Sequence, residues 1–404
     1  MKKERKTALP ELLAPAGNME RLVTALRFGA DAVYLGAEAM SLRNYADNFT
    51  ADGLSEACAY AHARGKRVYV ACNAFARDTD LRALPALLRQ IRAAGADALI
   101  VNDAGVIRVA RDTVPELPLH LSTQANTLNA EAAMFWHEAG IRRIVLAREL
   151  SLAEIKEMRA ALPDALELEI FVHGAMCVSY SGRCLLSNYI AGRDSNRGEC
   201  AQPCRWTYEL RERGHNGAYF GIEQDALGTY ILNARDMNLI EHLPAVIETG
   251  ACSLKIEGRM KTALYVGTVA RTYRMAIDDY LESPDKYYAN LDKYRELISQ
   301  CTFRQYTTGF FFGKPDETTQ IYDKNVYERN YVYLGLVGEK VGEHKYTITQ
   351  KNKFCVGDTI EVMKKDGRDI EVKVISIQDE EGNEMESCPH PQQKLFIDLG
   401  IDLE

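Results

Sequence analysis

One segment of the chain, residues 169–206, constrains the fold and the chemistry more than any other. It reads EIFVHGAMCVSYSGRCLLSNYIAGRDSNRGECAQPCRW and holds four of the ten cysteines. Its apolar beginning predicts a buried strand, and the sequence rich in Gly, Ser and Arg that follows predicts a loop. Because the chain starts without a secretory signal, and large cytosolic enzymes rarely keep disulfides, these thiols indicate metal ligation or redox chemistry.

The spacing of these cysteines narrows the kind of site. Six residues separate Cys177 from Cys184, fifteen more precede Cys200, and three precede Cys204. A structural zinc site usually has two close pairs with about two to four intervening residues, and only the last pair here qualifies. Iron–sulfur clusters accept wider spacing. The pattern therefore favours a four-iron cluster (4Fe-4S), with zinc or mostly unligated buried cysteines as alternatives, and Cys252 as an alternative fourth ligand.

The remainder of the first 284 residues alternates short apolar strands with helical segments. Parallel sheets produce strands that are apolar throughout, as these are. The predicted strands begin at Leu12 and recur at 31–36, 67–72, 98–101, 119–122, 143–146, 166–172 and 253–257. Eight such units favour a (β/α)8 barrel over an open doubly wound sheet. No Gly-x-Gly-x-x-Gly follows the first strand, which argues against a dinucleotide-binding fold.

We therefore predict an α/β fold in three parts. Residues 1–284 form a TIM-like barrel with a cysteine-rich insertion at 175–250, after strand 7. Residues 285–328 are a helical, aromatic connecting segment. Residues 329–404 alternate polar and apolar positions, which predicts a small all-β barrel, and Lys365-Asp-Gly-Arg predicts a hairpin turn within it.

Polar residues follow many of the predicted strands, where the active site of a (β/α)8 barrel lies. They are Asn18, Arg43, Asn44, Asn73, Asn102, Gln124, His173, Glu257 and Arg259. Helix capping is the simpler role expected for Asn18 and Asn102. An ion pair between Glu257 and Arg259 is the structural alternative for those two residues.

The net charge of −8 argues against a protein that coats nucleic acid non-specifically. A local basic patch would suffice for one nucleotide, and Arg193, Arg197 and Arg205 beside the cysteines are candidates for RNA binding, although a solvated basic loop is the alternative. No apolar run approaches 18 residues, so no membrane span is expected. We expect a cytoplasmic protein.

Three strings in the chain resemble the peptidase U32 family, the "collagenase-like" proteins. They are residues 169–187, NRGECAQPCR at 196–205, and KIEGR at 255–259. The resemblance extends from Leu12 to about Gly313. The length and C-terminal end resemble one branch of the family, the prephenate-dependent tRNA hydroxylation proteins, which form 5-hydroxyuridine at the wobble position.

The resemblance implies a tRNA-hydroxylating enzyme with tRNA and prephenate as partners, and pairing with a homologous subunit is an option that the family also offers. It implies an iron–sulfur cluster on Cys177, Cys184, Cys200 and Cys204. Glu257 and His173 are the candidate catalytic residues. The candidate substrate ligands are Arg43, Asn44, Lys255, Arg259 and Gln124, because a dicarboxylate such as prephenate requires cations. A U32-type peptidase and a metal-stapled subunit of a hydroxylase complex are the alternatives.

Overall fold

The structure is a computed structural model that describes residues 9–38, 40–41, 48–177, 179–206, 224–225, 228–229, 235–313, 328, 330–390 and 392–403. The chain divides into two compact units. The first comprises Met1–Arg295 and Phe303–Glu328, and the second comprises Glu296–Thr302 and Arg329–Glu404.

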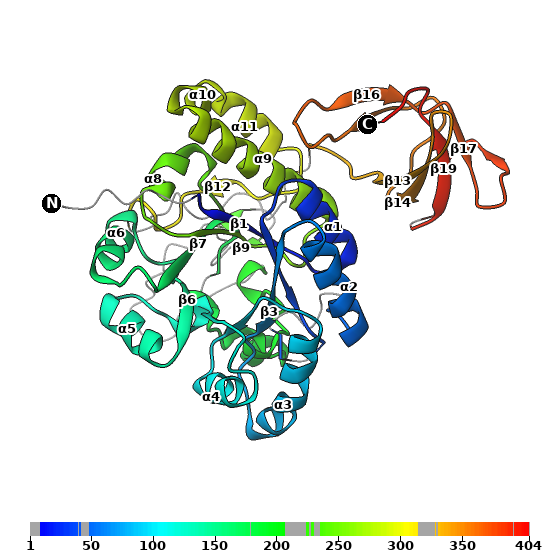
Figure 1. Ribbon diagram of the computed structural model, residues 1–404. Helices are drawn as coiled ribbons and strands as arrows, with labels where there is room; N and C mark the ends of the chain where they lie inside the picture. Colours follow the sequence, from blue (N-terminus) through cyan, green and yellow to red (C-terminus); the bar gives the residue numbers. More distant parts are fainter. Residues whose placement is uncertain are drawn as a thin grey trace. The chain divides into compact units, whose positions relative to one another are not determined.

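The first unit is a closed barrel of eight parallel strands, as predicted (Figure 1). The strands are β1 (Glu11–Pro15), β2 (Ala32–Gly36), β3 (Arg67–Cys72), β4 (Ala98–Val101), β5 (Leu119–Leu121), β6 (Ile141–Val145), β7 (Glu167–Ala175) and β11 (Ser253–Ile256). The ring closes because β11 pairs in parallel with both β7 and β1. Two short strands extend the sheet beside β7: β10 (Asp236–Asn238) antiparallel to it and β12 (Tyr306–Thr307) parallel to β10.

Helices surround the barrel strands in Figure 1. They are α1 (Met19–Arg27), α2 (Ala51–His62), α3 (Asp78–Ala93), α4 (Ala104–Thr113), α5 (Ala130–Glu138), α6 (Leu152–Ala161), α8 (Leu243–Ile247), α9 (Ala263–Glu282), α10 (Pro284–Ala289) and α11 (Leu291–Ile298). None of the described helices combines the length and apolar character needed to cross a membrane.

Two capping predictions had different outcomes. The side chain of Asn18 accepts a hydrogen bond from the backbone N–H of Arg21 and caps α1, as expected. The prediction for Asn102 was wrong, because the next residue, Asp103, caps α4 by accepting from the N–H of Val106. Asn102 is instead a buried residue at the end of β4.

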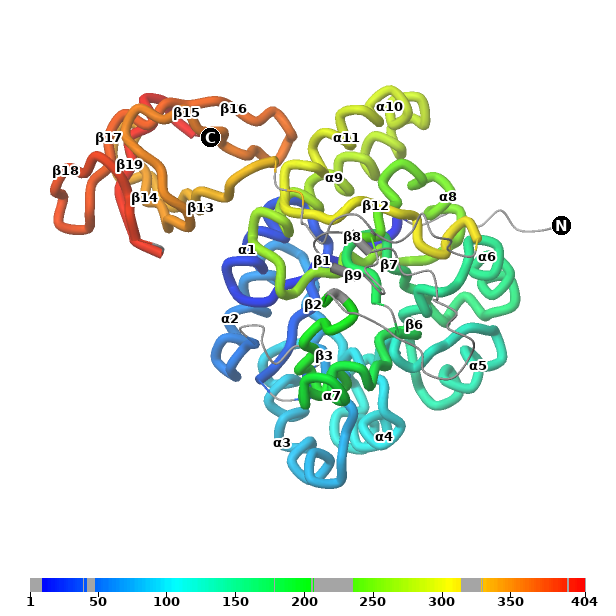
Figure 2. Tube along the Cα trace, turned by 180° about the vertical axis from the view of Figure 1, so that it is seen from behind, coloured from blue at the N-terminus to red at the C-terminus, as the bar shows by residue number. Residues whose placement is uncertain are grey.

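The cysteine-rich segment follows β7, as predicted, and consists mainly of single helical turns. They are η2 (Tyr180–Gly182), α7 (Leu186–Ala191), η3 (Ser195–Arg197) and η4 (Pro203–Arg205), followed by the short strand pair β8 (Gln224–Asp225) and β9 (Gly228–Thr229). Figure 2 shows α7 beside β3 and α3. A hydrogen bond joins the two regions, since the N–H of Phe75 donates to the carbonyl of Asn196 at 3.0 Å.

In the second unit, the described residues from 330 onwards form an all-β region, as predicted, whereas Glu296–Thr302 includes the end of α11. Its five-stranded antiparallel sheet has the order β13 (Gly335–Gly342), β14 (Lys345–Gln350), β19 (Lys394–Asp398), β17 (Ser376–Gln378) and β18 (Glu384–Met385). A hairpin pairs β15 (Thr359–Val362) with β16 (Ile370–Lys373) around the predicted Lys365-Asp-Gly-Arg turn. Tyr346, Ile348, Val374 and Ile397 belong to its apolar core.

Candidate active site at the mouth of the barrel

A cavity of about 410 Å³ lies at the C-terminal ends of the barrel strands and extends beneath the cysteine-rich segment. Nine of the predicted site residues line it: Cys177, Cys184, Cys200, Cys204, Asn73, Gln124, Lys255, Glu257 and Arg259. The structure therefore brings together residues that are up to 186 positions apart in the chain, from Asn73 to Arg259. This is the place where a (β/α)8 barrel presents functional side chains.

The other predicted site residues lie elsewhere or outside the described residues. Arg43 and Asn44 are not among the described residues, and for Arg205 only the backbone is described. His173, Arg193 and Arg197 are described but do not line the cavity.

Glu257 is held by a cation that the sequence interpretation missed. The guanidinium of Arg148 donates to the Glu257 carboxylate at 3.2 Å and to the carbonyl of Ala175 at 2.9 Å. It also lies over the ring of Phe171, 3.9 Å from the centroid. Arg148 lines the cavity and follows β6 by three residues, so its position after a barrel strand was the signal that could have found it.

Two glycines, on β7 and at the end of β2, leave room for residues of the KIEGR string. A Cβ at Gly174, whose φ is +112°, would lie 2.5 Å from the carbonyl oxygen of Glu257. A Cβ at Gly36 would lie 2.5 Å from Nη1 of Arg259. The space beside Gly36 is occupied by this guanidinium, whose Nη1 donates to the hydroxyl of Ser41 at 2.8 Å. Side chains at either glycine would displace residues that line the cavity.

The floor of the cavity is connected to a charged network inside the barrel. Nζ of Lys255 donates to Glu169 at 2.7 Å, and Glu169 also accepts from Arg143 at 3.2 Å. Arg143 in turn donates to Glu11 at 2.8 Å. Burial acts to raise the pKa of Glu169, but the charges of Lys255 and Arg143 outweigh it and lower that pKa to about 2. Lys255 is therefore a paired, buried cation that borders the cavity.

His173, in β7, occupies a buried aromatic environment and does not line the cavity. Its imidazole is 2% exposed and contacts the rings of Tyr265, Tyr273 and Tyr306. Burial lowers the pKa of His173 to about 3, although a hydrogen bond with Asn238 acts in the opposite direction. The imidazole is therefore uncharged at neutral pH.

The four cysteines of the segment are free thiols that converge on the cavity. Burial raises the pKa of Cys177, and the neighbouring Cys184 and Cys200 raise it further, whereas a backbone hydrogen bond and the charge of Arg148 lower it. Among the residues that the structure describes, no three His, Cys, Asp or Glu side chains are placed to hold one metal ion. Thiolates on one zinc must approach within about 4 Å of each other, because each lies about 2.3 Å from the metal. Ligands of a multi-iron cluster bind separate irons and can therefore lie farther apart than the ligands of one zinc ion.

The two candidates for the fourth ligand lie at different ends of the barrel. Cys204 lines the cavity. Cys252 precedes β11, and its thiol lies 3.7 Å from the Glu167 carboxylate at the start of β7. The cavity is at the opposite ends of these strands. The position of Cys204 thus fits the predicted ligand set.

Asn196 and Arg197 attach the cysteine-rich segment to the barrel. The amide of Asn196 accepts from the N–H of Cys184 at 3.2 Å and donates to its carbonyl at 2.8 Å. The guanidinium of Arg197 donates to both carboxylate oxygens of Asp80, at 2.7 and 3.2 Å, and to the carbonyl of Phe75. Arg197 was predicted to contact RNA, and its contacts in the structure are those of a structural anchor.

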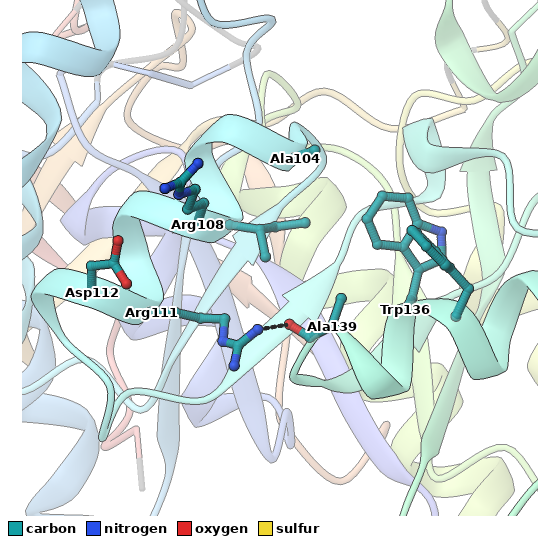
Figure 3. Close-up of a pocket in the computed structure, with 8 residues that line it drawn as sticks. Ala104, Arg108, Arg111, Asp112, Trp136 and Ala139 are labelled. Atoms are coloured by element: carbon teal, nitrogen blue, oxygen red, sulfur yellow. Dashed lines mark hydrogen bonds between the residues drawn. The ribbon is translucent and has the colours of Figure 1, made fainter.

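A second hollow, of about 360 Å³, lies on the outside of the barrel between α4 and α5 (Figure 3). Trp136 forms one wall and Arg111 the other, and Arg111 donates to the carbonyl of Ala139 at 2.9 Å. None of the predicted site residues lines this hollow. The cavity at the strand ends is therefore the candidate active site.

Comparison with known families agrees with the sequence resemblance. The model of "Peptidase family U32" matches residues 17–321, and that of the "Peptidase family U32 C-terminal domain" matches residues 329–404. The chain belongs to peptidase family U32. The first match covers the barrel unit from α1 onwards, and the second covers the all-β region.

Several relatives in this family carry names that refer to RNA hydroxylation. The tRNA hydroxylation protein P1 of Bacillus subtilis is 40% identical over 96% of this chain and 91% of its own length. The tRNA hydroxylation protein P of Escherichia coli is 36% identical over 98% and 95%, respectively. The 23S rRNA 5-hydroxycytidine C2501 synthase of Escherichia coli is 37% identical over 67% of this chain and 40% of its own length.

Proposed function

We propose that this U32 protein hydroxylates the wobble uridine of tRNA to 5-hydroxyuridine in a prephenate-dependent reaction, with a 4Fe-4S cluster on Cys177, Cys184, Cys200 and Cys204. The observation that carries the proposal is the composition of the cavity, which is lined by four cysteines and by a group of cations. The names of the relatives that match almost the whole chain support tRNA hydroxylation as the activity.

The charges of the cavity favour a small anionic substrate. Among the described residues, its lining includes the cations Arg148, Lys255, Arg259 and Lys261 and one carboxylate, Glu257, so four positive charges less one negative charge leave +3. The buried Glu169 pairs with Lys255 behind the lining, which still leaves an excess of positive charge. The whole chain has a net charge of −8, so the cavity lining is positive in a protein that is negative overall. Arginine binds carboxylates through two parallel hydrogen bonds, and prephenate carries two carboxylates.

The cysteines supply soft ligands for iron, and an iron–sulfur cluster bound there would supply one-electron redox chemistry. Replacing C5–H of uracil by C5–OH removes two electrons from the base, and these must pass to a co-substrate that is consumed, because a bound cluster returns to its starting state after each turnover. The hydrogen at C5 leaves as a proton. Glu257 carries the one carboxylate among the described lining residues and is therefore the candidate acceptor, with Arg148 fixing its orientation.

A U32-type cysteine protease receives less support from the geometry. Such a mechanism needs a histidine within hydrogen-bond reach of the thiol. His173 is in contact with Asn238 and three tyrosine rings, and its Nδ1 has no partner among the described residues. Cys177 is not among its hydrogen-bond partners.

The test uses full-length protein purified without oxygen. We expect about four irons and four sulfides per chain, with both lost in Cys184→Ala and retained in the matched control Cys355→Ala in the all-β unit. We expect 5-hydroxyuridine in tRNA, detected by mass spectrometry, only when prephenate is supplied, and its loss in Glu257→Gln with the iron retained. Stoichiometric zinc without iron would rule out the cluster, and product formation without prephenate would rule out the co-substrate.

A further inference from the structure

One side of the cavity is lined by neutral polar side chains rather than by charges. Asn73 follows β3, Ser122 follows β5, and Gln124 lies in η1 (Thr123–Ala125). The charged lining residues, among them Arg148 and Lys255, come from the ends of β6 and β11. The cavity therefore offers a neutral polar subsite beside a cationic one.

The strand register explains why these amides face inward. Ala71 on β3 pairs with Ile100 on β4, and both line the cavity. Side chains two positions along a strand share the same face, so Asn73 and Asn102 continue the inward-facing rows. The N–H of Ser122 donates to the carbonyl of Val101 at 2.7 Å, which extends the β4–β5 ladder and keeps Ser122 in the next row.

The hydrogen bonds within this group use only part of its capacity. The Asn73 amide donates to Gln124 Oε1 at 3.1 Å and to Ser122 Oγ at 3.3 Å, and Ser122 lies 3.4 Å from the same Gln124 oxygen. Gln124 is 4% exposed, and the hydrogen bonds that it makes with described residues use its Oε1. The carbonyl oxygen of Asn73 and both polar atoms of Asn102 are buried without partners in the described part of the chain. Buried polar groups are normally hydrogen-bonded, so this group of amides is incomplete without a ligand.

We infer that Gln124 and Asn73 read the O4–N3 edge of a uracil base that enters the cavity, an inference that rests on the proposed function. Gln124 Nε2 supplies a donor for the acceptor O4, and Asn73 Oδ1 supplies an acceptor for N3–H. Enzymes that modify a base take it out of its stack and read its Watson–Crick edge through such pairs. The buried amide of Asn102, next to Asn73 in the strand register, supports the same neutral surface.

This arrangement selects uracil against cytosine and also orients the base. Cytosine carries a donor, N4–H₂, where uracil carries O4, so the Gln124 donor would face another donor. A buried mismatch of this kind reduces the specificity constant roughly 10- to 100-fold. Because C5 is bonded to C4, a base held along O4 and N3 directs its C5–C6 edge away from the amides. That edge then faces the part of the cavity that Glu257 and the cysteines line.

The experiment measures base preference with the full-length, iron-containing protein and prephenate. Two anticodon stem-loop transcripts differ only in uridine or cytidine at the modified position, and kcat/KM is determined for each. Gln124→Glu keeps the shape but replaces the donor by a carboxylate oxygen. We expect the uridine-to-cytidine ratio of kcat/KM to fall roughly 10- to 100-fold. Gln124→Met, which removes the donor without adding charge, lowers kcat/KM for uridine.

The matched control is Gln90→Glu, the same change at an exposed position of α3, and it leaves the ratio unchanged. Tryptophan fluorescence and iron content verify that each variant is folded and loaded. If the wild type hydroxylates uridine and Gln124→Glu keeps the wild-type ratio, the assignment of the base-reading pair is wrong while the proposed function stands. If the loaded wild type hydroxylates neither transcript, the proposed function fails and this inference fails with it.

Discussion

Removing the negative charge of Glu169 tests the network inside the barrel most directly. Glu169 is fully buried and pairs with Lys255 at 2.7 Å and Arg143 at 3.2 Å. In Glu169→Gln, Arg143 keeps its hydrogen bonds to Glu11 and Glu167, which are both 2.8 Å long in the wild type. Lys255 has no second carboxylate partner among the described residues. Leaving one buried charge unpaired costs about 3–5 kcal/mol of folding free energy.

The pKa of Glu169 gives an independent value for the folding free energy that its ion pairs contribute. A drop from the ordinary 4.5 to about 2 corresponds to about 3 kcal/mol at neutral pH. Because the folded-state pKa is the lower one, this stabilisation is present above about pH 4.5 and is lost as the pH falls towards 2. We therefore expect the difference in unfolding free energy between wild type and Glu169→Gln to shrink over that window.

Urea unfolding followed by tryptophan fluorescence is the appropriate assay. The chain has two tryptophans, Trp136 and Trp206, and both lie in the barrel unit, so the all-β unit contributes no tryptophan signal. The control Glu167→Gln changes a partly exposed carboxylate whose partner Arg143 remains doubly paired, and should cost no more than about 1 kcal/mol. A loss below about 1 kcal/mol in Glu169→Gln, or a loss that does not change with pH, would refute the reasoning.

Two further predictions concern the anchor of the cysteine-rich segment and the buried histidine. Asp80→Asn weakens the ion pair with Arg197, so amide hydrogen exchange of residues 184–200 should accelerate roughly 5- to 10-fold. The control Asp78→Asn, at the exposed start of α3, should leave these exchange rates unchanged. If Asp80→Asn exchanges at the wild-type rates, Arg197 does not act as the anchor. Burial keeps the pKa of His173 at about 3, so between pH 6.5 and 3 the imidazole is charged only in the unfolded chain, and barrel stability rises with pH in that window. His173→Phe should reduce the proton uptake on unfolding at pH 5, measured from the pH dependence of the unfolding free energy, by about one proton, and an unchanged uptake would contradict the low pKa.

The barrel was predictable because its strands and helices alternate with little interruption. Each strand is a short and mainly apolar run, and most strands are followed by a helical segment, with polar residues between the two at the mouth. The same rule placed Gln124, Glu257 and the cysteines in one cavity. Arg148 and Lys261 follow the same rule but were missed, because a single arginine or lysine after a strand looks like an ordinary surface residue.

The partners of the charged residues were not predictable in the same way. Glu11, Arg143 and Glu169 lie on three different strands, and the first two are separated by 132 positions in the chain. Charges within otherwise apolar strands indicate that a paired network exists, since unpaired buried charges are very costly. Which charges meet depends on how the barrel closes, and that is a property of the register between β1 and β11 and between β6 and β7.

The path of the cysteine-rich segment explains how a single insertion can cover the whole mouth. The segment leaves β7 beside the cationic side of the cavity, where Arg148 contacts Ala175 and Glu257. In a ring of eight strands, β3 lies four strands away from β7 and therefore on the opposite side. Arg197 binds Asp80 at the start of α3, directly after β3, so the segment must cross the mouth between its two attachments. Cys184 is fixed near the far attachment by Asn196, whereas Cys177 is near the start of the crossing. The crossing thus sets the cysteines above both the amide side and the cationic side, so each ligand in the cavity would lie beneath the same thiols.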